Sequence, residues 1–171
     1  LYLGRIVEMG PTERLFADLR RSPDALHQAL SVITDVTIRF ALDAIDAGAH
    51  GVFFATQLAS YRLLAVDEYE RFGKAYDLRV LAALAGKARL SMLHAHGDDI
   101  MFDLLADYPV EMINWHDRLT EPTLRDAASR FPGLLVGGLN EHGALAKGDL
   151  HAVEAEVRDA KMKPSYMMDE V

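Results

Sequence analysis

Hydrophobic positions along this chain follow two alternating patterns, one typical of amphipathic helices and the other of buried strands. Apolar residues three or four positions apart predict a helix over residues 22–47, with Ser22 as its N-cap, Pro23 at its first position and Gly48 as its stop. Its predicted apolar face consists of Leu26, Leu30, Ile33, Val36, Ile38, Phe40, Leu42 and Ile45. The next run, residues 51–56, is short, apolar and partly aromatic, which predicts a buried strand.

The same alternation continues toward the end of the chain. It predicts further helices over residues 66–86, 99–108, 120–131 and 150–162, and further strands over residues 89–97, 110–117 and 133–141. Thr120 is the predicted N-cap of the third of these helices. Four strands separated by helices predict parallel βα units, and two closures are open: a doubly wound sheet or part of a (β/α)8 barrel.

The two ends of the chain depart from this pattern. Residues 1–11 predict a strand or hairpin, and Thr12 is a predicted cap for a helix that begins at Glu13. Residues 163–171 show no hydrophobic period. We therefore predict an atypical N-terminal segment over residues 1–18, one folded region over residues 19–162 and a tail over residues 163–171. Because the first residue is Leu1 rather than Met, we expect this chain to be a piece of a longer protein.

The charge and the absence of Cys then exclude several classes of binding partner and site. The 26 acidic and 18 basic residues give a net charge of -8, which argues against nucleic acids and anionic membranes as partners. The absence of Cys excludes disulfides, Cys-based zinc sites and Cys nucleophiles, and it fits a reducing cytoplasm. No apolar run approaches the ~20 residues that span a bilayer. We therefore expect a cytoplasmic protein that binds a small molecule.

Polar side chains gather where the predicted strands end, and they form the candidate site. In both closures ligands bind at the carboxyl ends of parallel strands. The four ends carry Thr56 and Gln57; His94, His96 and Asp98; Asn114, Trp115, His116 and Asp117; and Gly138 and Asn140.

The residue types at these ends leave several interpretations open. His94 and His96 are two positions apart, so on a strand both rings face one side and could bind a metal ion together with Asp98; alternatively, they only donate hydrogen bonds. Asp98 and Asp117 are candidate acid–base groups. Trp115 either forms the wall of a site for a flat aromatic ligand or packs in the core. The sequence has no GxGxxG or Walker pattern, so no nucleotide site is predicted.

Three blocks of the chain resemble the uroporphyrinogen decarboxylase superfamily. They read IDAGAHGVFFATQLAS, LSMLHAHGDDIMFDLLADYPVEMINWHD and LLVGGLNEHGAL, and their order and separation agree with that family. The resemblance implies an α/β fold in which these blocks are about strands four to seven of a (β/α)8 TIM barrel. It also implies a carboxy-lyase of porphyrin biosynthesis that removes the acetate carboxylates of a tetrapyrrole and uses no cofactor.

The site residues of that family fit this chain unevenly. Thr56 stands where the decarboxylase has a substrate-contacting Ser, and Trp115 matches the family's Trp, but Asn114 replaces the Asp before it. Gly138 and Asn140 replace the Asn and Asp of the family's GN-x-DP block. We predict catalytic roles for His96, Asp98 and Asp117. We predict substrate contacts for Thr56, Gln57, His94, Asn114, Trp115, His116, Gly138 and Asn140.

Two alternatives follow from the same resemblance. The zinc-dependent methyltransferases of the superfamily act between corrinoids and thiols, and His94 matches their zinc-binding His, but His96 replaces one zinc-binding Cys and the final Cys is absent. Alternatively, the chain is a catalytically incomplete half barrel, whose open sheet edges favour a homodimer or pairing with the missing half. Residues 1–18 also resemble a segment near the C-terminal end of peptide-type ABC transporter ATPases.

Overall fold

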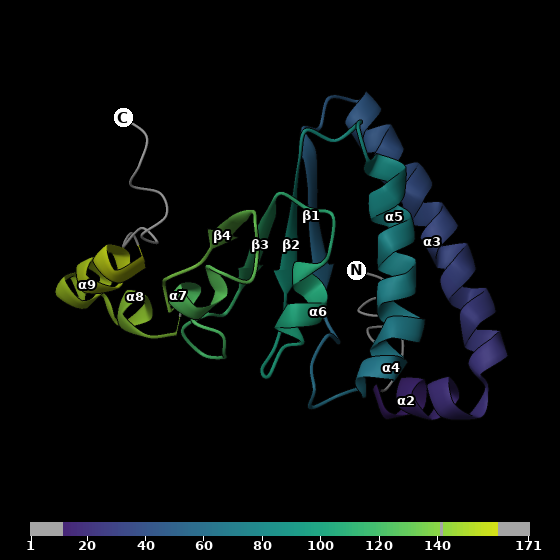
Figure 1. Cartoon of the computed structure of the whole chain (residues 1–171), viewed down its shortest axis with the longest axis horizontal. Helices are drawn as coiled ribbons and strands as arrows, with labels where there is room; N and C mark the ends of the chain where they lie inside the picture. Colours follow the sequence, from purple (N-terminus) through teal and green to yellow (C-terminus); the bar gives the residue numbers. More distant parts are fainter. Residues whose placement is uncertain (1–11, 141, 161–171) are drawn as a thin grey trace.

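The structure is a computed structural model that describes residues 12–140 and 142–160. Its centre is a four-stranded, all-parallel sheet (Figure 1). The strands are β1 (Gly51–Thr56), β2 (Leu90–Ala95), β3 (Met112–Trp115) and β4 (Leu134–Val136), and they lie in that order across the sheet. Each strand pairs with the next one in the sequence across a helical connection. The predicted fold class, an α/β partial (β/α)8 barrel, is therefore confirmed. The strand or hairpin predicted over residues 1–11 and the tail over residues 163–171 lie outside the described residues.

The helices match the predicted ones in position more than in length. They are α2 (Thr12–Arg21), α3 (Pro23–Asp46), α4 (Val66–Tyr69), the π-helical segment η1 (Glu70–Lys74), α5 (Ala75–Leu84), α6 (Phe102–Ala106), α7 (Leu124–Ala127), α8 (Ala144–Lys147) and α9 (Leu150–Ala160). The long helices α3 and α5 run side by side (Figure 1). Within the part of the chain that the structure describes, no helix has both the length and the apolar character needed to cross a membrane.

The first long helix, α3, begins and ends as predicted, and its buried face agrees with the predicted one in part. Leu26 and Leu30 are buried, and Ile38, Leu42 and Ile45 pack against the core. The buried residues of α3 are Leu26, Leu30, Thr34, Thr37 and Ala41. The predicted core residues Val36 and Phe40 are instead 51% and 72% exposed. Thr37 enters the core because its hydroxyl donates to the Ile33 carbonyl at 2.9 Å, which satisfies its polar atom within the helix. Ser22 is the N-cap residue, as predicted, but its side chain makes no capping hydrogen bond.

The helix predicted over residues 66–86 is divided by the π-helical segment η1. Tyr69 is 1% exposed, and Gly73 lies beneath its ring. A Cβ atom at position 73 would lie 2.5 Å from a ring carbon of Tyr69, so a side chain there would displace the buried ring. The wider turn of η1 is a local change of helical period, which the spacing of apolar residues does not reveal.

The connection after β3 begins its helix later than predicted. Thr123 caps α7 by accepting a hydrogen bond from the Asp126 N–H at 3.2 Å. Thr120, the predicted cap, accepts instead from the Asp99 N–H at 2.8 Å and so ties the loop after β2 to the loop after β3.

The two faces of the sheet have opposite surroundings because side chains alternate along each strand. Phe54, Leu93 and Ile113 lie in register and are 0–4% exposed within the core that the helices cover. On the other face Phe53, Met92, Met112 and Leu134 lie in register, and both Phe53 and Leu134 are 58% exposed. We call this second side the open face.

A buried polar network holds α5 against the segment after α6. The hydroxyls of Tyr69 and Tyr108 both donate to Asp77 Oδ2, at 3.0 and 2.8 Å, and lie 3.1 Å from each other. Asp77 is partly exposed as a residue, but its carboxylate end is buried, and this burial raises the pKa of Asp77. Burial, reinforced by the nearby Asp77 carboxylate, raises the pKa of both tyrosines well above the ordinary range. The two phenols therefore stay protonated donors in neutral solution.

Candidate functional site

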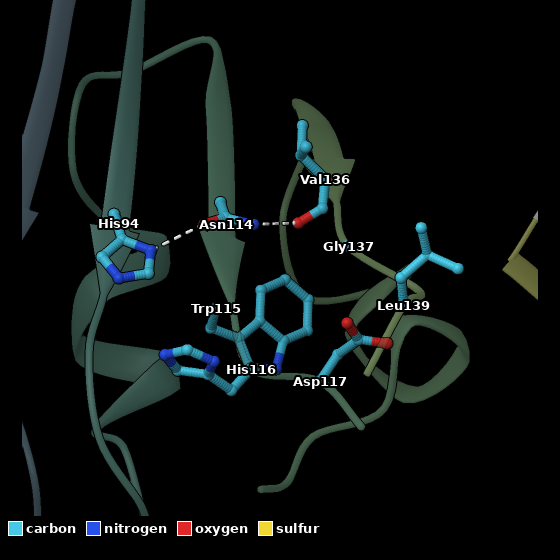
Figure 2. A pocket seen from close by; sticks show the side chains of 8 residues that line it. All are labelled: His94, Asn114, Trp115, His116, Asp117, Val136, Gly137 and Leu139. Carbon is cyan, nitrogen blue, oxygen red and sulfur yellow. Dashed lines mark hydrogen bonds between the residues drawn. The ribbon is translucent and has the colours of Figure 1, made fainter. Parts of the chain in front are cut away.

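The open face becomes polar toward the carboxyl ends of the strands. Ala55, His94, Asn114 and Val136 lie in register there, two residues beyond the apolar layer. This polar layer opens into a cavity of about 290 Å³, shown in Figure 2. Its lining residues are His94, Asn114, Trp115, His116, Asp117, Val136, Gly137 and Leu139.

A chain of hydrogen bonds crosses three strands in this layer. Asn114 Nδ2 donates to the Val136 carbonyl at 2.7 Å, and Asn114 Oδ1 lies 2.6 Å from His94 Nδ1 (Figure 2). Phe53 stacks on the His94 ring with a centroid separation of 5.4 Å. The His94 imidazole is therefore held by contacts both at its edge and on its face.

Three imidazoles meet at the carboxyl ends of β2 and β3. The ring centroids of His94, His96 and His116 lie 5.5–6.1 Å apart, with the rings edge-on to one another. His116 also lines a second cavity of about 210 Å³ together with His96, Gly97, Asp98, Leu119 and His142, so the two cavities adjoin. Imidazoles exchange protons near neutral pH and both donate and accept hydrogen bonds. This cluster can therefore bind a carboxylate or carry a proton.

The histidines were also predicted as metal ligands, together with Asp98. Among residues 12–140 and 142–160, no group of three or more His, Asp or Glu side chains is placed to hold a metal ion. A zinc site in a protein uses at least three protein ligands. The Asp98 carboxylate lies instead 3.3 Å from Arg62 Nη1, in a pair exposed to solvent. The predicted pair of His94 and His96 therefore does not gain a third ligand in this part of the chain.

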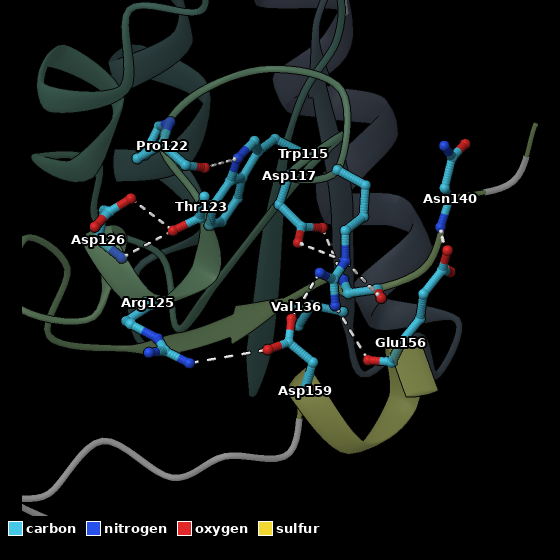
Figure 3. Close-up of polar contacts among 12 residues, drawn as sticks. Trp115, Asp117, Pro122, Thr123, Arg125, Asp126, Val136, Asn140, Glu156 and Asp159 are labelled. Atoms are coloured by element: carbon cyan, nitrogen blue, oxygen red, sulfur yellow. Dashed lines mark hydrogen bonds and ion pairs between the residues drawn. The ribbon is translucent and has the colours of Figure 1, made fainter. Parts of the chain in front are cut away.

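The predicted acid–base group Asp117 takes part in a clamp behind the cavity. It is 7% exposed, and its Oδ1 accepts from the Gly138 N–H at 2.7 Å. The neighbouring Arg118 donates to the Gly138 carbonyl at 2.9 Å, to Asp159 Oδ2 at 2.6 Å and to the Glu156 carbonyl at 3.1 Å. Figure 3 shows Asp117 with Glu156 and Asp159 of α9. The clamp ties the loop after β4 to α9, and sequence spacing alone does not predict it.

Gly137 leaves room for this arrangement. A Cβ atom at this position would collide with the Asp117 carboxylate. The pair Gly137–Gly138 therefore permits a close approach, as the sequence suggests, but the group that approaches in this structure is a side chain of the same protein.

Two predicted substrate contacts lie mainly on the helix side of the sheet. Thr56 is 3% exposed and donates to the His94 carbonyl at 3.2 Å. Trp115 lines the first cavity but is only 2% exposed; it packs edge-on against Phe102 and donates its indole N–H to the Pro122 carbonyl at 2.8 Å (Figure 3). Its core contacts therefore dominate its surroundings.

Two further predicted contacts lie at the margin. Gln57 follows β1 and is half-buried, and the Asn140 N–H donates to Glu156 Oε2 at 3.1 Å. Neither residue is among those that line the two cavities. The structure adds Val136, Leu139 and His142 to the lining residues, of which His142 follows the predicted fourth strand and carries an ionisable side chain.

Replacing Arg118 with alanine is expected to release α9 locally. The variant loses hydrogen bonds from a charged donor, each worth about 1.5–3 kcal/mol, so amide exchange in residues 150–160 should accelerate about 10–100-fold. Hydrogen exchange followed by mass spectrometry measures this effect. Arg125→Ala is the matched control, because Arg125 is 72% exposed and lies 3.8 Å from the same Asp159. Equal acceleration in both variants would contradict the clamp.

Comparison with known proteins gives the family. The family described as uroporphyrinogen decarboxylase (URO-D) matches residues 5–165. A protein of Nocardia farcinica (strain IFM 10152) named uroporphyrinogen decarboxylase is 31% identical over 163 residues, which cover 90% of this chain and 43% of that protein. The chain thus spans less than half the length of this relative. No solved structure gives a significant match. From the family match and this relative, we conclude that the chain belongs to the uroporphyrinogen decarboxylase family.

Proposed function

We propose that this chain supplies part of the active-site cleft of a cofactor-free carboxy-lyase that removes acetate carboxylates from a tetrapyrrole of the uroporphyrinogen type. The observation that carries the proposal is the cluster of His94, His96 and His116 at the carboxyl ends of β2 and β3. Family membership supports the reaction class.

The open face has an apolar layer and a layer of imidazoles, and these suit the apolar rings and the carboxylates of such a substrate. A tetrapyrrole has an apolar ring system with carboxylates around its rim. The layer of Phe53, Met92, Met112 and Leu134 offers an apolar surface to the rings. The imidazoles above it offer N–H donors, which form strong hydrogen bonds with carboxylates when the imidazole is charged.

The reaction needs groups that hold and move protons. Protonation of a pyrrole carbon makes the ring an electron sink, and the electron pair of the broken C–C bond then forms an exocyclic double bond as CO₂ leaves. A proton adds to the exocyclic carbon, which becomes a methyl group, and the ring carbon releases its own proton. We assign proton transfer to His96 and Asp98, which line the same cavity, and shaping of the cavity wall to Asp117.

The remaining predicted residues have supporting roles in this proposal. His94, Asn114 and His116 bind the substrate from the open face, and Trp115 and Gly138 back the cavity wall. Gln57 contacts the substrate at the end of β1, and Asn140 does so in the loop after β4. Thr56, which is buried on the helix side, supports the end of β2 through its hydrogen bond to the His94 carbonyl.

The open face needs a cover for this cleft to close. β1 and β4 are the two edges of the sheet, and the apolar side chains of Phe53 and Leu134 face outward from it. We include in the proposal that a second copy of this chain, or the remaining half of a barrel, covers this face.

Incubating the full 171-residue chain with uroporphyrinogen III, without oxygen, is expected to yield products with fewer carboxylates. His96→Ala should lower the rate about 10²–10⁴-fold, because it removes the proposed proton carrier. Chromatography that separates products by carboxylate number measures the rate. His50→Ala is the control, since His50 lies in the loop before β1, at the opposite end of the sheet.

A rise of specific activity with chain concentration would indicate that a second copy completes the cleft. A folded chain that leaves every carboxylate in place at all concentrations would rule out completion by a second copy. The same result after addition of the remaining barrel half would overturn the proposal, and equal rates for the two histidine variants would remove His96 from the mechanism.

A further inference from the structure

We propose that Ser60, in the loop after β1, is a positioning residue that holds the turn around Asp98, a residue that lines the second cavity. The part played by Asp98, proton transfer, rests on the proposed function. The hold on the turn rests on the hydrogen bonds among the described residues alone.

The chain around Asp98 has an unusual backbone conformation. Gly97 and Asp99, the residues on either side of it, both have positive φ angles, of 93° and 50°. Aspartate tolerates this conformation better than most residues do, but it remains costlier than helical or extended backbone. Strained residues of this kind persist only where the surrounding structure holds them, and they gather at functional sites. The neighbouring loops must therefore supply the contacts that hold this turn.

The loop after β1 binds both carbonyl groups of the turn, and Ser60 is at the centre of its contacts. Ser60 is 2% exposed; its hydroxyl donates to the Asp98 carbonyl at 2.7 Å and accepts from the Arg62 N–H at 3.2 Å. The Tyr61 N–H donates to the Asp99 carbonyl at 2.9 Å. The Ser60 hydroxyl thus joins the two loops through a buried atom that uses both its donor and its acceptor capacity.

The Asp98 carboxylate and the other side of the turn are also held. Arg62, whose N–H binds the Ser60 hydroxyl, places its Nη1 3.3 Å from Asp98 Oδ2. An exposed ion pair is weak by itself, so the position of this guanidinium depends on the loop that carries it. From the loop after β3, Thr120 accepts a hydrogen bond from the Asp99 N–H at 2.8 Å. Ser60 is the buried anchor in this set of contacts.

A fixed position of Asp98 matters for proton transfer, because a displacement of about 1 Å can lower a rate by about 10²-fold. Removing the Ser60 hydroxyl leaves the Asp98 carbonyl without this donor and lets the strained turn relax. The carboxylate is then still present, but it spends less time where it reaches the substrate. We therefore expect the loss to fall on kcat rather than on KM.

The hold on the turn is tested by amide hydrogen exchange in the full 171-residue chain. Ser60→Ala should accelerate exchange in residues 97–101 about tenfold or more, because a buried acceptor loses its donor. Thr37→Ala is the matched control, since Thr37 is 5% exposed and its hydroxyl also donates to a carbonyl, at 2.9 Å, but within α3. Unchanged exchange in Ser60→Ala would overturn the proposal, and so would equal acceleration of residues 97–101 by Thr37→Ala.

The role toward Asp98 is tested by turnover of uroporphyrinogen III. Ser60→Ala should lower kcat about 10–100-fold and change KM by less than about threefold, and Ser60→Thr, which keeps the hydroxyl, should restore most of the rate. Thr120→Val keeps the shape of a partly exposed side chain and removes the acceptor of the Asp99 N–H, so it should lower kcat in the same direction.

An unchanged kcat in both Ser60→Ala and Thr120→Val would overturn the role toward Asp98, and so would an equal loss of kcat in Thr37→Ala. Absence of turnover in the unmodified chain would count against the proposed function. In that case the exchange rates would still decide whether Ser60 holds the turn.

Discussion

Replacing Trp115 with alanine is expected to lower the free energy of unfolding by about 3–5 kcal/mol, a typical cost of deleting a buried aromatic side chain. Trp115 is 2% exposed, its ring centroid lies 5.0 Å from that of Phe102, and its indole N–H donates to the Pro122 carbonyl. The alanine variant loses the apolar contacts, leaves a cavity and removes the donor. Urea denaturation followed by circular dichroism measures the loss.

Two further variants identify the cause of that loss. Trp115→Phe keeps an aromatic ring but not the indole N–H, so we expect a smaller cost of about 1–3 kcal/mol. Phe40→Ala removes an aromatic side chain that is 72% exposed, and its effect should stay within about 0.5 kcal/mol. Comparable losses from Trp115→Ala and Phe40→Ala would show that the buried position of Trp115 does not stabilise the fold.

Replacing Asp77 with alanine is expected to cost about 2–5 kcal/mol. The hydroxyls of Tyr69 and Tyr108 both donate to Asp77 Oδ2, and each buried donor left without its acceptor costs about 1–3 kcal/mol. Thermal or urea unfolding measures the effect. Asp35→Ala is the matched control: Asp35 forms an exposed pair with Arg79 at 2.8 Å, and such a pair is worth about 0–1 kcal/mol. Equal costs for the two Asp variants would contradict a stabilising role for the network.

The same carboxylate predicts a dependence of stability on pH. Burial raises the pKa of Asp77, so the folded state binds its proton more tightly than the unfolded state does. The stability that the folded state gains from this tighter proton binding is fully present below the unfolded pKa of about 3.9. It is lost as the pH rises through the folded pKa. Asp77→Asn should remove this fall from the curve of unfolding free energy against pH. Parallel curves for the two proteins would contradict the raised pKa.

The succession of elements is predictable from the sequence because the hydrophobic period changes clearly between helix and strand. The β1 strand forms over the predicted residues 51–56. The face of α3 is less predictable, since Thr37 is buried with its hydroxyl bonded inside the helix while the apolar Val36 and Phe40 face solvent. A scale that ranks residues by hydrophobicity therefore misplaces these three residues, although it places Leu26 and Leu30 correctly in the core.

The candidate site is predictable in part for a related reason. His94, Asn114, Thr56 and Trp115 all lie near a strand end, so the sequence groups them in one site. Because side chains alternate along each strand, His94 and Asn114 lie on the open face and Thr56 and Trp115 on the opposite face. Alternation is visible in the sequence, but which set faces the helices depends on packing. The contacts of Arg118 with α9 lie about 40 residues away along the chain, and no local pattern indicates them.

The order of the strands also has a consequence for how the protein forms. Each strand pairs with the one that follows it in the sequence, so the pairings can form one after another from the N-terminal side during synthesis. β4 is the last of the four described strands to leave the ribosome, and its Val136 carbonyl orients Asn114 and, through it, His94. We therefore expect the His94 site to mature after the first three of these strands have formed the scaffold beneath it.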